Sequence, residues 1–166
     1  MTFSYKKYSA KYKTLFKEMK SRILAEVGHG IIVEHIGSTA VHGLGGKGII
    51  DISIGIRKWS EAPKIIQTLK KLGFSHFHEL ENHGLFASTK AQCEEGDFHI
   101  HISRIGTKRY EDTLAFRDFL RQSPAEVSRY DRLKSNLFEK CEGNRQLYKE
   151  MKNKYFAELV KIENYI

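Results

Sequence analysis

Residues 33–56 constrain the fold more than any other stretch of this chain. A β-branched run ends at Gly37 and Ser38, a glycine-rich loop follows, and a second apolar run at 49–56 carries one acidic residue, Asp51. A core strand rarely tolerates a lone carboxylate, because burying an unpaired charge is expensive. A Gly-Ser turn followed at short range by an aspartate on a strand therefore suggests a site for phosphate and a metal ion.

Length and composition predict a single domain over residues 1–166, large enough for a hydrophobic core. The chain is 40% hydrophobic and 29% charged, which is typical of a soluble globular protein. No uncharged apolar run approaches the roughly 20 residues that cross a bilayer, and residues 1–8 lack the apolar core of a signal peptide. Cys93 and Cys141 lie far apart, so we expect reduced thiols in a cytoplasmic protein with no membrane partner.

The net charge of +8 favours anionic partners, namely nucleotides, coenzymes or nucleic acid. Many of the lysines fall on the polar faces of the expected helices, where a solvated surface explains them equally well. Charge alone therefore does not favour nucleic acid, and this partner stays open.

Apolar residues recur with helical or strand spacing along the whole chain. Up to residue 106 the spacing predicts helices at 8–27 and 61–72 and strands at 31–36, 49–56, 74–78, 84–88 and 97–104. From residue 107 the pattern is helical only. Ser123 to Glu126 forms a capping-box motif with a proline at the first helical position, and a last helix is expected at 147–162. We therefore expect an α+β fold: a mixed sheet backed by helices over about 1–106, and a helical C-terminal portion over about 107–166.

Strand periodicity selects the residues that could carry chemistry. Side chains alternate between the two faces of a strand, so Asp51 and Ser53 share one face of 49–56, while Asp97, His99 and His101 share one face of 97–104. If these faces align, Asp51 and the two histidines converge. A His-x-His pair suits a transition metal, whereas carboxylates suit magnesium. The alternative is that the histidines face solvent or form hydrogen bonds in a cleft, and Asp97 fits a third ligand or a turn residue.

The loop after the first strand is a candidate phosphate site. Backbone N–H groups at Gly37 and Ser38, with the hydroxyls of Ser38 and Thr39, could hold a phosphate; an ordinary helix cap explains the same residues. The G-x-G-x-x-G match at 43–48 precedes a strand instead of opening a helix, so it does not predict dinucleotide binding. The Walker pattern fails as well, because Gly48 follows Lys47 where serine or threonine is required.

Two resemblances follow from these motifs. Gly37-Ser38, twelve residues and then Asp51-Ile-Ser-Ile54 resemble the nucleotidyltransferase superfamily, with Ser53 where that superfamily carries a second acid. The chain resembles the GrpB-like family of small bacterial proteins more closely, through residues 34–39, Gly43-Leu44, Lys47, 49–52, 99–101, 114–121, Pro124, Tyr130, Leu133-Lys134 and 148–156. This resemblance covers nearly the whole chain and implies a nucleotidyltransferase-like fold. Some members of the family are fused to a dephospho-coenzyme A kinase, so a nucleotide or a coenzyme A-related molecule is the implied ligand.

The first functional hypothesis is a nucleotide-dependent transferase. Gly37, Ser38 and Thr39 would hold the triphosphate, and Lys47 would neutralise its charge. Asp51 would bind a divalent metal, magnesium, manganese or a transition metal. His99 or His101 would supply the missing ligand or act as a general base. The second hypothesis is a non-catalytic nucleotide- or coenzyme-binding module, and the third is a metal-dependent hydrolase that uses Asp51, His99 and His101.

Three further side chains have more than one possible role. Arg117 and Lys134 could reach a phosphate, although salt bridges within the helical layer explain them better. His35 could orient the Gly-Ser loop, join the metal ligands or serve as a structural histidine. Neither the substrate nor the oligomeric state follows from the sequence.

Overall fold

The computed structural model describes residues 4–80, 84–89, 95–142, 144 and 146–154. A five-stranded sheet forms its centre, in the spatial order β1-β2-β5-β4-β3. The strands are β1 (Ile32–Ile36), β2 (Ile50–Ile56), β3 (His76–Leu80), β4 (Gly84–Ser88) and β5 (Phe98–Arg104). The β2–β5 pair is parallel, and the other three neighbouring pairs are antiparallel. The expected mixed sheet is confirmed.

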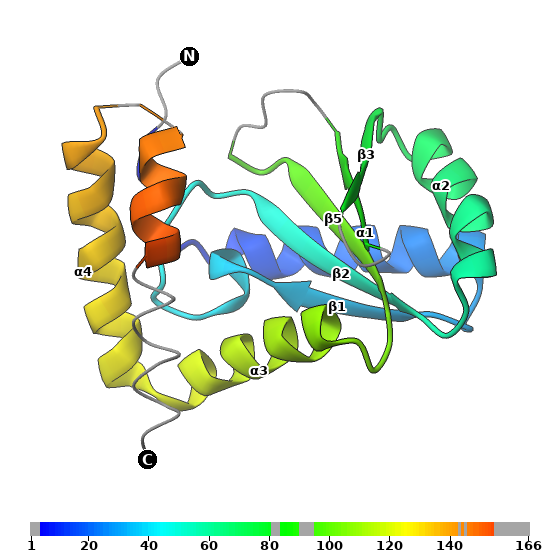
Figure 1. Ribbon diagram of the computed structural model, residues 1–166, viewed down its shortest axis with the longest axis horizontal. Coiled ribbons are helices and arrows are strands. Elements are labelled where there is room, and N and C mark those ends of the chain that lie inside the picture. The colour runs from blue at the N-terminus through cyan, green and yellow to red at the C-terminus, as the bar shows by residue number, and fades with distance from the viewer. Residues whose placement is uncertain (1–3, 81–83, 90–94, 143, 145, 155–166) are drawn as a thin grey trace.

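One face of the sheet is apolar and covered by two helices, α1 (Lys11–Val27) and α2 (Ala62–Lys71) (Figure 1). The four alternate isoleucines of β2 are fully buried on this face. Tyr12, Met19 and Ile23 pack against them from α1, at the spacing that puts residues on one side of a helix. Ile65 and Leu69 do the same from α2. This layer holds the main hydrophobic core.

The opposite face is covered by α3 (Lys108–Gln122). Tyr110 packs directly over Gly55, where an added Cβ would lie 2.7 Å from the tyrosine ring. Glycine at this strand position therefore lets the helix approach the sheet. α4 (Pro124–Lys140) and a helical segment at 146–154 stand at the end of this layer (Figure 1). The α+β architecture with a helical C-terminal portion is thus as expected.

Local details differ from the sequence-based expectation. Ser123 precedes α4 but its side chain makes no capping hydrogen bond, and Glu126 instead lies 3.6 Å from Arg129, one helical turn away. The predicted capping box is therefore wrong. The last helix is described over 146–154, and the rest of its expected range lies outside the described residues, as does Cys93. Cys141 is a buried free thiol. None of the helices in the described part of the chain is both long and apolar enough to cross a membrane.

Candidate functional site

A cleft of about 480 Å³ lies between the polar face of the sheet and the helices α3, α4 and 146–154. Because β2 and β5 are parallel and in register, Asp51 is paired with His99 and Ser53 with His101. All four side chains line the cleft. The convergence that strand periodicity predicted for Asp51 and the two histidines is present.

Asp51 is held by both histidines. Its Oδ1 atom lies 3.3 Å from Nδ1 of His99 and 3.7 Å from Nε2 of His101. Burial raises the pKa of the Asp51 carboxyl, but the neighbouring imidazoles of His101 and His99 lower it by more, so that the pKa falls well below its usual range. Asp51 therefore carries its charge at neutral pH, and its partners are basic side chains.

The loop after β1 is built around this carboxylate. Gly37 has φ of 70°, and a Cβ at this position would lie 2.3 Å from Oδ2 of Asp51. Only glycine permits both the backbone conformation and the close approach. A single 3₁₀ turn, η1 (Ser38–Ala40), follows, so the expected strand-to-helix turn is a short one. Gly37 and Ser38 both line the cleft, as predicted for a phosphate loop.

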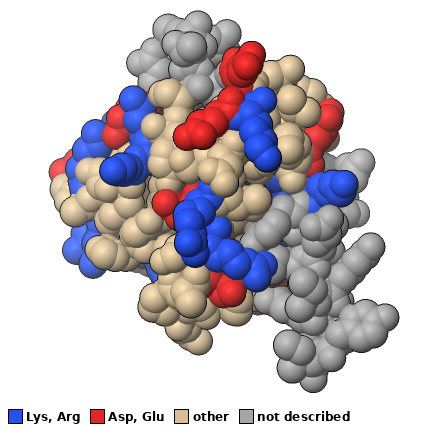
Figure 2. Space-filling model, turned by 90° about the vertical axis from the view of Figure 1, so that its left-hand side faces the viewer, with Lys and Arg blue, Asp and Glu red and all other residues tan. Residues whose placement is uncertain are grey.

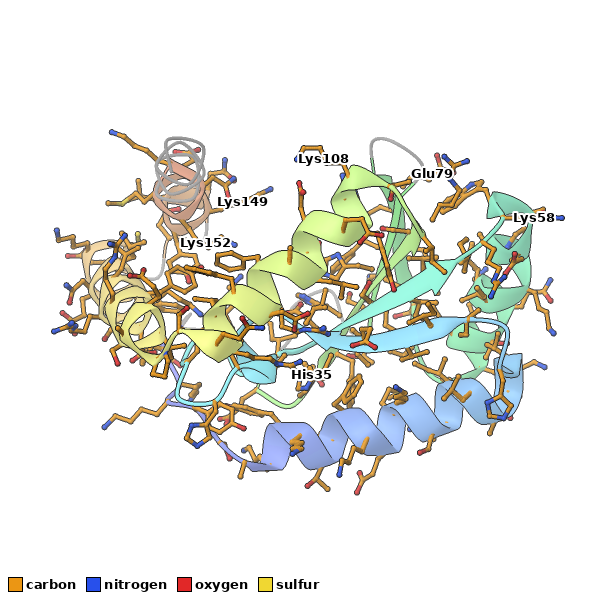
Figure 3. All side chains as sticks on the ribbon, turned by 90° about the horizontal axis from the view of Figure 1, so that it is seen from below. His35, Lys58, Glu79, Lys108, Lys149 and Lys152 are labelled. Carbon is orange, nitrogen blue, oxygen red and sulfur yellow. The ribbon has the colours of Figure 1, made fainter. Side chains whose placement is uncertain are left out.

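Thr39 and His35 belong to the other side of the sheet. The Thr39 hydroxyl donates to the carbonyl of Ile49 at 3.1 Å and lies 3.0 Å from Nε2 of His35. His35 stacks on Phe16 of α1, with ring centroids 4.5 Å apart, and Figure 3 shows it on the α1 side of the sheet. Neither residue is among the cleft-lining residues. The predictions that Thr39 holds phosphate and that His35 binds a metal are therefore wrong, and His35 is a structural histidine.

Burial explains why His35 is neutral in the fold. Only 6% of the residue is exposed. Burial lowers its pKa to about 4, and Arg121 and Arg117 lower it further while Asp51 opposes the change.

Lys134 reaches the cleft from α4 and is 4% exposed. Its Nζ donates to the carbonyl of Gly45. A Cβ at Gly46 would lie 2.7 Å from Ser38 Oγ and 2.9 Å from Lys134 Nζ, so the hydroxyl and the ammonium converge on this glycine. Burial lowers the pKa of Lys134 to about 7, with a contribution from Lys152.

The loop that carries Gly45 and Gly46 is fastened from two directions. Asp131 of α4 accepts a hydrogen bond from the Gly45 amide at 2.6 Å and another from the Tyr5 hydroxyl. Lys6 and Gly46 exchange two backbone hydrogen bonds. The position of Lys134 relative to Ser38 is therefore set by a held loop, although the loop is glycine-rich.

Arg117 has a structural role. Its guanidinium donates to Glu34 at 2.6 Å, to the carbonyl of His35 at 3.1 Å and to both oxygens of Asp118. These bonds fix α3 to β1. Arg117 lines the cleft, but four of its five N–H groups have these partners, so the salt-bridge alternative is present in the structure and a phosphate contact by Arg117 stays a prediction.

The cleft is rich in positive charge. Asp51 is the only carboxylate among its described lining residues, against five basic side chains: Lys47, Arg109, Arg117, Lys134 and Lys152. By contrast, the outer face over α4 and residues 146–154 shows Lys and Arg near its middle with Asp and Glu beside and around them (Figure 2). The described lining of the cleft thus carries more basic than acidic side chains, and this outer face shows no broad basic footprint of the kind typical of nucleic-acid binding.

Lys152 and Arg109 were not singled out from the sequence. Lys152 extends from the 146–154 helix toward the cleft (Figure 3), and burial lowers its pKa. A signal was available, because Lys152 follows the buried Tyr148 by four residues and therefore shares its inward helix face.

The residues of the cleft do not fit a resident metal ion. Among the residues that the structure describes, no group of three or more His, Cys, Asp and Glu side chains is arranged to hold one. Asp51 Oδ1 is shared by the two imidazoles, and Oδ2 lies against Gly37. Glu34, which lies opposite Ser53 on β1, is paired with Arg117.

Several relatives of this chain come from bacteria. The crystal structure of conserved protein GrpB from Enterococcus faecalis superposes with a TM-score of 0.84 at 23% identity, over 98% of this chain and 99% of that chain. The glutamate-rich protein GrpB of Alkalihalophilus pseudofirmus is 27% identical over 158 residues, which are 92% of this chain and 91% of the relative. A UPF0157 protein of Halalkalibacterium halodurans is 28% identical over 95% of this chain and 80% of its own length.

A more distant likeness joins the chain to Cid1 poly(U) polymerase with MgGTP bound, at a TM-score of 0.47 and 14% identity over 68% of this chain and 38% of that chain. This likeness is too weak to carry a function to the present protein. The match that decides the family is the one described as GrpB protein, which spans residues 3–161. The chain therefore belongs to the GrpB family.

Proposed function

We propose that the cleft binds the phosphate groups of a nucleotide or of a coenzyme A-related molecule. The observation that carries this proposal is the buried ammonium of Lys134 beside Ser38 on the cleft wall. A buried charge is costly unless it is paired. In the structure Lys134 Nζ donates to the neutral carbonyl of Gly45 and lies 5.2 Å from the centroid of the Tyr130 ring, and the charges of Asp131 and Asp51 offset only part of the effect of burial on its pKa. A phosphate oxygen in the cleft supplies the opposite charge.

The surroundings of Lys134 favour an anion with more than one negative charge. Lys47 and Lys152 line the same cleft, and each lowers the pKa of Lys134 through repulsion. Three neighbouring ammonium groups repel one another, and a polyphosphate relieves that repulsion. The Ser38 hydroxyl and the turn after Gly37 add neutral donors, which phosphate oxygens accept.

Binding should not require a divalent cation. The lysines supply the positive charge that magnesium supplies elsewhere, and Asp51 is engaged by His99 and His101. The divalent-metal hypothesis leads to the opposite result, because chelation would then abolish binding. Titration with ATP in the presence of either EDTA or magnesium distinguishes the two.

The direct test is isothermal titration of ATP, coenzyme A and tripolyphosphate into four proteins: the wild type, Lys134→Met, Lys152→Met and Lys149→Met. Hydrogen bonds to charged groups contribute about 1.5–3 kcal/mol, so the first two variants should bind about 10- to 100-fold more weakly. Lys149 is exposed on the same helix and provides the control. Unchanged affinity in Lys134→Met would overturn the proposal.

The affinity should also depend on pH. Lys134 has a pKa of about 7 without ligand, and phosphate favours its charged form. Affinity should therefore fall as the pH rises above 7, and Lys134→Met should flatten that dependence.

A second candidate function is transfer of a phosphoryl or nucleotidyl group. The observation that favours it is the contact between Asp51 and Nδ1 of His99 at 3.3 Å. A carboxylate on one imidazole nitrogen orients the ring, so that the other nitrogen can take a proton from an attacking hydroxyl. ³¹P NMR of ATP with the protein and a hydroxyl-bearing acceptor tests this candidate. His99→Asn should abolish turnover while ATP still binds. If ATP stays intact with every acceptor, water included, the transfer candidate is excluded and only the binding function remains.

A further inference from the structure

The polar face of the sheet continues beyond the cleft as a row of side chains. Residues directly opposite each other on neighbouring strands run Ser53 on β2, His101 on β5, Phe86 on β4 and His78 on β3. Direct cross-strand partners project from the same face of a sheet. The row therefore leads from the floor of the cleft to the β3 edge.

The far half of this row is aromatic. The Phe86 ring meets His99 and His101 edge to face, with centroids 4.8 and 5.2 Å apart. The centroid of the Phe86 ring also lies 4.6 Å from the centroid of the His78 ring. We call Phe86 and His78 the aromatic ledge. Phe86 is half-buried and His78 is exposed, so the ledge is held in place by His99 and His101 but not covered.

The ledge adjoins the lysine-lined cleft, because His99 and His101 line the cleft and also contact the Phe86 ring. Adjacent strands lie about 4.8 Å apart, so β4 is about 10 Å from β2 across the sheet. The ribose and phosphate chain of a nucleotide bridges such a distance. Aromatic side chains bind the flat faces of bases by stacking, without regard to base identity.

We propose that the aromatic ledge of Phe86 and His78 binds the planar base of the ligand while its phosphates lie among the cleft lysines. The site then selects molecules in which an aromatic base is joined to phosphates, and it discriminates against polyphosphates and phosphorylated sugars. This inference rests on the proposed function, because the phosphate end orients the ligand. It adds a contact that neither the fold nor the phosphate loop requires.

The test compares ligands with and without a base. ATP, coenzyme A and tripolyphosphate are titrated into the wild type, Phe86→Ala and Glu79→Ala. Glu79 follows His78 on β3 and projects from the opposite face, so it is the matched control. Loss of stacking should weaken ATP and coenzyme A about 5- to 100-fold in Phe86→Ala. The affinity for tripolyphosphate should stay within about twofold of the wild-type value.

Two more variants keep the test decisive if Phe86→Ala does not fold. Phe86→Leu keeps an apolar side chain without the ring and should show the same selective loss, whereas Phe86→Tyr should restore ATP affinity. If the affinities for ATP and tripolyphosphate fall equally, or if neither falls, the ledge does not bind the base. The proposed phosphate site would be unaffected by that result. Failure of all three ligands to bind the wild type would instead remove the proposed function itself.

Discussion

The two faces of the one sheet differ in what they pack against. The face under α1 and α2 is filled by isoleucines that are completely buried. The face under α3 carries Asp51, Ser53, His99 and His101, and leaves a cleft. Successive residues of a strand point to opposite faces. Along β2, residues that stabilise the core therefore alternate with residues that line the cleft. Changes at adjacent positions of β2 should therefore have different consequences.

The largest expected effect comes from the filled face. Ile52→Ala removes a side chain with no exposed surface from the contact with α1 and α2, and should lower the free energy of unfolding by about 2–5 kcal/mol. Ser53→Ala, at the next residue, should cost less than about 1.5 kcal/mol. Urea denaturation of both variants checks this. Similar losses would mean that the two faces are not energetically distinct.

His35 makes the filled face sensitive to acid. Its pKa is about 4 in the fold and about 6.5 in an unfolded chain. The unfolded chain therefore takes up the proton first as the pH falls, and about 3 kcal/mol of stability should be lost between pH 6.5 and 4. In His35→Gln the melting temperature should depend less on pH across this range. The same change at the exposed His29 should leave the pH dependence intact.

Asp51 should behave as a carboxylate that its two histidine neighbours stabilise. Its folded pKa lies far below the unfolded value, so its contribution is present above about pH 4 and is lost as the pH falls further. Asp51→Asn should therefore destabilise by about 1–3 kcal/mol at neutral pH. Thermal melts with and without magnesium and manganese measure this. A loss that appears only with metal present would restore the metal hypothesis.

A last pair of variants tests whether the cleft depends on a close approach at Gly37. Gly37→Ala meets both a positive φ and the Asp51 carboxylate, whereas Gly28→Ala meets a positive φ with nothing within 4 Å of the added Cβ. The backbone strain common to both should cost about 1–2 kcal/mol. Only Gly37→Ala should also weaken ATP binding. Equal effects on ATP would show that the carboxylate contact does not matter for binding.

The strands and their faces could be predicted because they depend on local alternation. Spacing alone placed Asp51 on the polar side of its strand and His99 and His101 on the polar side of theirs. The parallel pairing then brought the two polar sides onto one face of the sheet. The role of His35 stayed open among three alternatives for a related reason. A lone histidine on a strand does not reveal which layer its face meets, and here Phe16 of α1 decided it.

The sequence by itself determined the α+β fold and the two-faced strands, because hydrophobic periodicity and turn residues act over a few neighbouring positions. Its motifs, taken in order along the chain, indicated the family. Tertiary structure alone decided which cations reach the cleft. Lys134 approaches Ser38 beside a loop that Asp131 and Tyr5 hold in place. Arg117 instead forms salt bridges with Glu34 and Asp118. Long basic side chains reach partners on distant elements, and helix packing selects those partners.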